Sequence, residues 1–166
     1  ASFRRAMAAS SSGTAPRWSP PRCRRLPKSA RAAASPGRAA AAIRDGRQKE
    51  LSLGDTSAQR DWGDARDYVR GMWLSLQQEV PRDYVFASGV LHSVQDIVEI
   101  AFASVGLEWR QHVRQDPRFL RPAEPSNLVG NASRAHTLLG WKPEIGFEQL
   151  IAEMTRAELT PGGLAV

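Results

Sequence analysis

The strongest pattern in this chain is a run of apolar residues at helical spacing in its middle third. The run falls at positions i, i+3, i+4, i+7, i+8 and i+11 and consists of Ala65, Tyr68, Val69, Met72, Trp73 and Leu76. These residues share one face of an amphipathic helix. Pro81 limits the helix at its far end.

Three further helices are indicated by capping residues and apolar spacing. Ser93 followed by Asp96 resembles a capping box at the start of a second helix. Asn131 can cap a short helix that runs through Leu139 and ends at Gly140. The last amphipathic helix is marked by Phe147, Leu150, Ile151 and Met154.

Short apolar runs between these helices predict strands. We expect one near "LSLGD" from Leu51, one over Asp83–Ser88 and one over Leu107–Val113, while "RAAAAIRDGRQKE" from Arg38 reads as a helix end. Residues 43–160 therefore predict an α/β fold, with four or five helices interleaved with short strands. The sequence shows no repeat and no heptad seam.

Composition divides the chain in two. The net charge of +6 combines +10 over residues 1–50 with −4 over residues 51–166. Residues 1–37 are rich in Ala, Arg, Ser and Pro and hold no acidic residue, so we expect this segment to be disordered. The other expected regions are a folded domain over 38–160 and a frayed tail over 161–166.

Three interpretations of the basic segment remain open. It resembles an organelle transit peptide in composition, or it is a basic tail that contacts nucleic acid or anionic lipid. The third is that GC-rich coding DNA has been read in a wrong frame. Since aromatic residues are scarce there, we expect no nucleic-acid partner, and no apolar run of about 18 residues predicts a membrane span.

Recognisable catalytic motifs are absent from the sequence. No G-x-G-x-x-G follows a strand, no Lys stands four residues after Tyr68 or Tyr84, and no G-x-S-x-G occurs. The three histidines are too widely spaced for a zinc site, so we expect no metal. The single Cys23 excludes an internal disulfide and is compatible with a reducing compartment.

The remaining candidate chemistry is anion binding. Arg60 opens an "RDWG" turn just before a helix N-terminus, where N–H groups and the helix dipole favour phosphate. Arg121 offers a second guanidinium, and Glu124 can accept hydrogen bonds from sugar hydroxyls. The alternative is that Arg60 pairs with Asp61 or Asp64 at the surface, and that Arg121 pairs with Glu124.

Three other side chains have simpler interpretations than ligand binding. Trp62 and Trp73 are expected to be core residues rather than stacking platforms. His92 is expected to lie in a loop near the start of the second helix.

Several motifs occur together and in order: "RDWG" with "DYV", "MWLSLQQE", "FLRPAE" and "LGWKPEI". Over residues 38–158 the chain closely resembles the GDP-mannose 4,6-dehydratases, which are extended short-chain dehydrogenase/reductases. The resemblance covers only the C-terminal portion of such an enzyme, the part that holds the GDP-sugar.

The resemblance implies an NADP-dependent, cytoplasmic lyase that converts GDP-mannose to GDP-4-keto-6-deoxymannose, and a homo-oligomer is one possibility for the full-length enzyme. Arg60 and Arg121 would meet the diphosphate and Glu124 the ribose. The motif carrying Asp55 departs from the family's "LGN" and puts a carboxylate near an anionic ligand, and Pro125 departs from its "RPAEV".

The NADP contacts and catalytic residues of the family match no position here, so the fragment alone is expected to be inactive. The alternatives are a non-catalytic module that binds GDP-sugar or pairs with an intact subunit, and a fragment of a related reductase or epimerase. A domain separated from its Rossmann partner is expected to expose a large apolar face.

Overall fold

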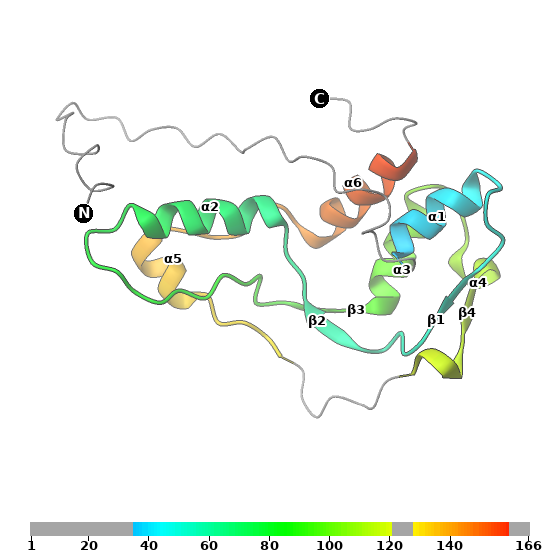
Figure 1. Cartoon of the computed structure of the whole chain (residues 1–166), viewed down its shortest axis with the longest axis horizontal. Helices are drawn as coiled ribbons and strands as arrows, with labels where there is room; N and C mark the ends of the chain where they lie inside the picture. The colour runs from blue at the N-terminus through cyan, green and yellow to red at the C-terminus, as the bar shows by residue number, and fades with distance from the viewer. Residues whose placement is uncertain (1–34, 121–127, 160–166) are drawn as a thin grey trace.

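The computed structural model describes residues 35–120 and 128–159. These ranges form a mixed α/β structure, which confirms the predicted class (Figure 1). In chain order the elements are α1 (Pro36–Arg44), β1 (Leu51–Leu53), β2 (Gln59–Asp61), α2 (Ala65–Leu76), β3 (Leu91–Ser93), α3 (Val94–Ala103), α4 (Trp109–His112), β4 (Val113–Gln115), the 3-10 helix η3 (Pro117–Phe119), α5 (Ser133–Leu139) and α6 (Phe147–Leu159). The described part thus holds six α-helices, where four or five were expected.

Helices α1, α3 and α6 pack on one another around the main hydrophobic core, while α2 and α5 lie together at the other end of the molecule (Figure 1). The close approach of α1 to α6 depends on Gly37, because a Cβ there would lie 2.8 Å from Oγ1 of Thr155. Trp62 packs against the core, as predicted, and Trp73 is half-buried. The core cluster consists of Ala39, Ala40, Ile43, Leu51, Ile97, Val98, Ala101, Phe102, Val113 and Ile151.

The four strands form two separate two-stranded ribbons. β1 pairs in parallel with β4, and β2 pairs antiparallel with β3, so that Arg60 lies opposite His92. The predicted strand at Leu51 is confirmed. The predicted loop position of His92 is wrong, because this residue is the middle of β3.

The helix predicted from Ala65 to Leu76 is confirmed, and much of its apolar face is exposed within the described part of the chain. Asp67 and Gly71 are the buried residues of α2, whereas Val69, Met72 and Leu76 are 37%, 56% and 80% exposed. Tertiary contacts of Asp67 and Gly71 orient the helix in this way, as described below.

Two predicted strands are not found. Residues 83–88 form no strand, because no neighbouring strand lies beside them within the described part of the chain. Leu107–Val113 divides into α4 and the start of β4, since the Glu108 carboxylate accepts a hydrogen bond from the Arg110 N–H and starts a helical turn.

The predicted helix ends are largely confirmed. Ser93 and Asp96 form the capping box at the start of α3, with N–H to oxygen distances of 3.0 and 2.7 Å. Gly140 ends α5 with a left-handed φ of 62°. The Asn131 side chain accepts from the Ser133 N–H at 3.0 Å, although the residue at the N-cap position is Ala132.

α1 begins at Pro36, so the last residues of the segment predicted to be disordered are helical. The rest of that prediction, residues 1–34, and the predicted frayed tail lie outside the described residues. Among the helices of the described ranges, none has the length and apolar character needed to cross a membrane.

Candidate functional site

The "RDWG" segment begins as a strand rather than a turn. Arg60 is the central residue of β2 and lies directly opposite His92 of β3, so their side chains leave the ribbon on the same face. The His92 ring stacks on Phe147 of α6 with centroids 3.7 Å apart and planes at 5°. Nη1 of Arg60 donates to the Gln59 carbonyl at 2.6 Å. The guanidinium therefore stands on a ribbon fixed to α6.

Asp61 is the hydrogen-bonding hub of the segment. Its Oδ1 accepts from the N–H and the hydroxyl of Ser88 at 2.9 and 2.5 Å, and its Oδ2 accepts from the N–H groups of Gly89 and Gly130 at 2.9 and 3.1 Å. Burial raises the pKa of Asp61, but these hydrogen bonds together lower it by more than burial raises it. The pKa of Asp61 therefore lies below its ordinary value. The ionised carboxylate joins two distant loops to β2.

Gly63 lies in close contact with the side chain of Tyr68 of α2. A Cβ at this position would collide with the Tyr68 hydroxyl, so any other residue there would displace the Tyr68 side chain. Burial raises the pKa of the Tyr68 hydroxyl, and the carboxylates of Asp61 and Asp67 raise it further. Tyr68 is therefore a neutral packing residue.

The N-terminus of α2 is already capped by a carboxylate. Asp64 accepts from the Arg66 N–H at 2.7 Å and forms two hydrogen bonds with its guanidinium, which lower the pKa of Asp64. Arg66 also contacts Glu153 of α6 at 2.7 Å. Asp64 thus occupies the place that a phosphate would take at this helix. The phosphate prediction for Arg60 therefore rests on its guanidinium alone.

The "LGWKPEI" segment is held by a second buried aspartate. Asp67 accepts from the N–H groups of Glu144 and Ile145 at 3.0 Å each, and its carbonyl accepts from the indole N–H of Trp141 at 2.8 Å. Trp141 is fully buried and meets the ring of Phe86 edge-on at 4.9 Å. The two family motifs are therefore parts of one packed unit.

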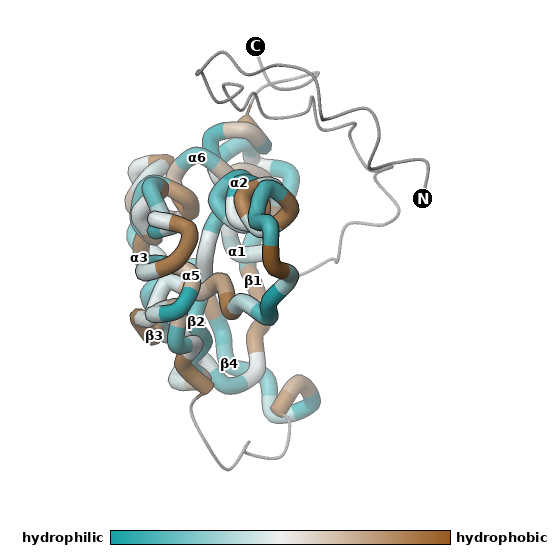
Figure 2. The backbone as a smooth tube through the Cα atoms, turned by 90° about the vertical axis from the view of Figure 1, so that its left-hand side faces the viewer, coloured by the Kyte–Doolittle hydropathy of each residue, from teal (hydrophilic) through white to brown (hydrophobic). Residues whose placement is uncertain are grey.

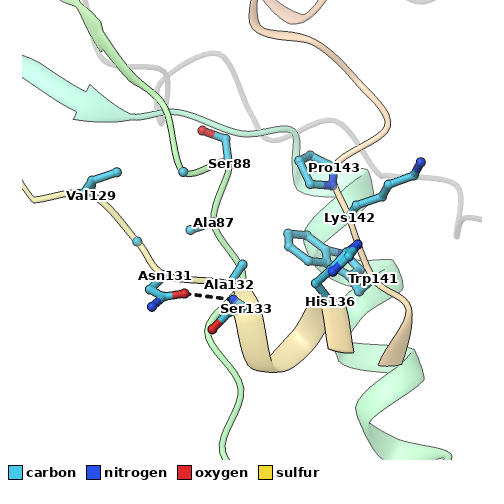
Figure 3. Close-up of a pocket in the computed structure, with 12 residues that line it drawn as sticks. Ala87, Ser88, Val129, Asn131, Ala132, Ser133, His136, Trp141, Lys142 and Pro143 are labelled. Carbon is cyan, nitrogen blue, oxygen red and sulfur yellow. Dashed lines mark hydrogen bonds between the residues drawn. The ribbon is translucent and has the colours of Figure 1, made fainter. Parts of the chain in front are cut away.

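An open cavity of about 350 Å³ lies beside this unit. Figure 3 shows Ser88 and Val129 on one side of it and His136, Trp141 and Lys142 on the other. Loop backbone at the glycines fixed by Asp61 forms part of the wall. The polar groups that line the cavity come from several short segments. Within the described ranges, no three or more His, Cys, Asp or Glu side chains lie close enough together to hold a metal ion.

Only one of the three predicted site residues falls in the described structure. Arg60 lies on β2, whereas Arg121 and Glu124 lie outside the described residues, so their predicted roles stay predictions. The carboxylate of Asp55 accepts from the N–H and hydroxyl of its neighbour Ser57 at 2.8 and 2.6 Å, which lower its pKa. It therefore has a local structural role.

Sequence reasoning missed the role of Asp61. Sequence reasoning treated Asp61 only as an ion-pair partner for Arg60. In the structure its carboxylate oxygens accept hydrogen bonds from groups 27, 28 and 69 residues away in the chain. The only available signal was glycine at two of the donor positions, Gly89 and Gly130.

Comparison with known proteins decides the family. The model of the GDP-mannose 4,6 dehydratase family matches residues 32–154. This chain belongs to the GDP-mannose 4,6 dehydratase family. It is 49% identical over 122 residues to GDP-mannose 4,6 dehydratase 1 of Arabidopsis thaliana, covering 74% of this chain and 34% of that protein. It is 45% identical over 140 residues to the GDP-mannose 4,6-dehydratase of Sinorhizobium fredii, covering 74% and 40%. The chain thus spans between a third and two fifths of the length of these relatives.

Solved structures confirm the predicted relation to Rossmann-type extended short-chain dehydrogenase/reductases. The structure of RMD from Pseudomonas aeruginosa complexed with NADPH has a TM-score of 0.68 and 26% identity, over 76% of this chain and 41% of that chain. UDP-glucose 4-epimerase from Bifidobacterium longum, in complex with NAD+ and UDP, has a TM-score of 0.59 and 18% identity over 75% and 38%. The second likeness shows the fold alone.

A nicotinamide cofactor, as implied by the family, does not fit the residues described. Such a cofactor needs a strand followed by a glycine-rich turn at a helix N-terminus. In the described part, β1 leads into "GDTS" and β2 into a helix capped by Asp64, and neither offers that turn. No chemical step through the cofactor is derived from this chain.

Proposed function

We propose that this chain is the GDP-sugar-binding portion of a GDP-mannose 4,6-dehydratase and is inactive alone. The match of the family model over residues 32–154 carries the proposal. A complete enzyme of this kind would convert GDP-mannose to GDP-4-keto-6-deoxymannose with NADP in the cytoplasm. The cofactor would be held by polypeptide equivalent to the part of the relatives that this chain does not match.

Arg60 is the described residue that we assign to the diphosphate. It stands on a strand that is fixed on both sides, by the Asp61 hydrogen bonds and by the stack of His92 on Phe147. A guanidinium held in this way grips phosphate oxygens at little cost in side-chain ordering. Arg121 and Glu124 remain the proposed partners for the diphosphate and the ribose.

A binding test on the full chain addresses this assignment. GDP and GDP-mannose are titrated while the indole fluorescence is followed, since Trp62 is close to Arg60 in sequence and its N–H donates to the His92 carbonyl. Replacing Arg60 by alanine should weaken GDP binding about 10- to 100-fold, since one charge-assisted contact is worth about 1.5–3 kcal/mol.

The matched control is Arg47→Ala, which removes an exposed arginine paired with Asp45. It should leave the affinity for GDP unchanged. Equal affinities of wild type and Arg60→Ala would refute the assignment of Arg60, and no binding by wild type at millimolar GDP would refute the binding proposal as a whole.

The alternative from another class is a stand-alone binding module. It predicts GDP binding by a monodisperse chain, whereas α2 exposes the apolar side chains of Met72 and Leu76. That exposure favours a domain that is normally covered by further polypeptide.

A further inference from the structure

The strand β2 consists only of polar residues, although it is half-buried. Gln59, Arg60 and Asp61 give it the hydrophilic colour that it has in Figure 2. Polar side chains that are drawn into a domain need hydrogen-bond partners. Asp61 finds its partners in the loops on one face of the ribbon, at Ser88 and Gly130. Because side chains alternate along a strand, Arg60 faces the opposite side.

His92 lies on the same face as Arg60 and directly beside it. The two residues are partners in the antiparallel pairing of β2 with β3, and the Cβ atoms of such partners are about 4.5–5.5 Å apart. Successive residues of a strand face opposite sides, so neither neighbour of His92 in β3 reaches this position. A group bound between the two side chains can therefore contact both of them.

The His92 ring is held in one orientation. It lies parallel to the ring of Phe147 on α6, with centroids 3.7 Å apart and planes at 5°. The His92 carbonyl accepts from the indole N–H of Trp62 at 3.3 Å, which fixes the backbone as well. Imidazole nitrogens form hydrogen bonds in the plane of the ring, so a face-to-face stack does not use them. A ring held in this way loses little freedom when it binds a ligand.

The stack alone does not account for a histidine at this position. In the described part of the chain the His92 side chain contacts Phe147 through its face, and no hydrogen bond to its ring nitrogens is present. The same ranges hold no buried side-chain nitrogen or oxygen that lacks a partner. The nitrogens of this half-buried ring are therefore open to solvent, and hence to a ligand.

The N-terminus of α3, which follows β3 directly, does not supply the donors for an anion at the ribbon. The N–H groups of Val94 and Gln95 donate to carbonyls of the loop before β2 at 3.0 and 2.9 Å. The next N–H belongs to the capping box. An anion beside Arg60 is therefore bound by side chains rather than by free N–H groups of this helix.

We propose that His92 is a second residue of the diphosphate site, and that an N–H of its ring donates to a phosphate oxygen beside the Arg60 guanidinium. Phe147 positions the ring through the stack. Two donors on paired strands suit the neighbouring phosphates of a nucleoside diphosphate, since each can bond a different phosphate oxygen. The inference rests on the proposed function for the nature of the ligand.

The test is the GDP titration of the full chain with the variant His92→Phe. This substitution keeps an aromatic ring for the stack on Phe147 and removes both ring nitrogens. The dissociation constant for GDP should rise about tenfold, because a hydrogen bond to a charged group is lost. Inorganic pyrophosphate carries the two phosphates without the nucleoside, so its dissociation constant, measured by competition with GDP, should rise by a similar factor. The melting temperature should change by less than about 4 °C.

The matched control is His112→Phe, since His112 is also half-buried and also stacks on a phenylalanine, Phe102, with ring centroids 6.1 Å apart. This variant should bind GDP as wild type does. A second measurement uses the wild-type chain alone: the ring ¹⁵N signals of His92 should shift when GDP is added, and those of His112 should not.

The inference is overturned if His92→Phe binds GDP as tightly as wild type, if His112→Phe weakens binding equally, or if pyrophosphate competes equally well with and without the substitution. Unshifted ring signals of His92 at saturating GDP would overturn it as well. In these cases a loss of affinity in Arg60→Ala would leave the proposed function standing. Absence of GDP binding by wild type at millimolar concentration would overturn both.

Discussion

Replacing Asp61 by asparagine tests the central contact of the site. An asparagine can keep one oxygen toward Gly89 and Gly130, but its NH₂ group then faces the Ser88 N–H, which loses its acceptor. The Ser88 hydroxyl can turn to accept instead. Loss of one charge-assisted bond and conversion of the three others to neutral bonds should lower the free energy of unfolding by about 2 kcal/mol, allowing for partial solvent exposure.

The expected change in melting temperature follows from the size of the folded part. With about 120 folded residues the entropy of unfolding is about 0.25 kcal/mol/K, so the variant should melt about 8 °C below wild type. Asp55→Asn is the matched control, because the Asp55 carboxylate makes only local bonds to Ser57, and it should melt close to wild type. Equal melting temperatures of Asp61→Asn and wild type would show that the hub does not hold the loops.

The stability difference between wild type and Asp61→Asn should depend on pH. Since the pKa of Asp61 is lowered in the folded state, the carboxylate stabilises the fold above the unfolded pKa of about 3.9, and this stabilisation is lost as the pH falls through the folded pKa. The difference in stability between wild type and Asp61→Asn should therefore be constant above about pH 5 and shrink below about pH 4. Thermal unfolding between pH 3 and pH 7 measures it. A difference that grows toward low pH would refute the assignment.

Two further substitutions test the packing around the site. Gly63→Ala should lower the free energy of unfolding by about 1–3 kcal/mol, because the added Cβ displaces Tyr68, whereas Gly146→Ala, with open space around it, should not; urea unfolding of both variants measures this, and equal midpoints would contradict it. Trp141→Phe should cost about 2–3 kcal/mol through the lost hydrogen bond to the Asp67 carbonyl and the space left by the smaller ring. A midpoint unchanged from wild type would show that the indole does not hold the "LGWKPEI" segment.

The sequence predicted helices well where the signal was local. Spacing and caps located α2, α3, α5 and α6, and the capping box of Ser93 and Asp96 is present as expected. The buried face of α2 could not be predicted, because the buried Asp67 carboxylate accepts hydrogen bonds from the N–H groups of Glu144 and Ile145, which are 77 and 78 residues away. Periodicity alone would have buried Met72.

The predictions that failed depended on distant partners or on a competing local bond. A strand over Asp83–Ser88 needs a neighbour, and the described part of the chain provides none. In Leu107–Val113 the cap by Glu108 outweighed the apolar pattern. For the site, the motif identified Arg60, but only the converging loops show that Asp61 holds its strand in place.

The burial of Asp67 has a consequence for the order of events during synthesis. Arg70 pairs with one oxygen of its carboxylate, but the N–H groups that bond the other oxygen are made only with Glu144 and Ile145, 77 and 78 residues later. At about 5–20 residues per second, ribosomes need about 4–16 s for that stretch. During this interval α2 of a nascent chain lacks the partners of its inner side, while its outer side is apolar, so the growing polypeptide should be a substrate for chaperones until Trp141 and Ile145 arrive.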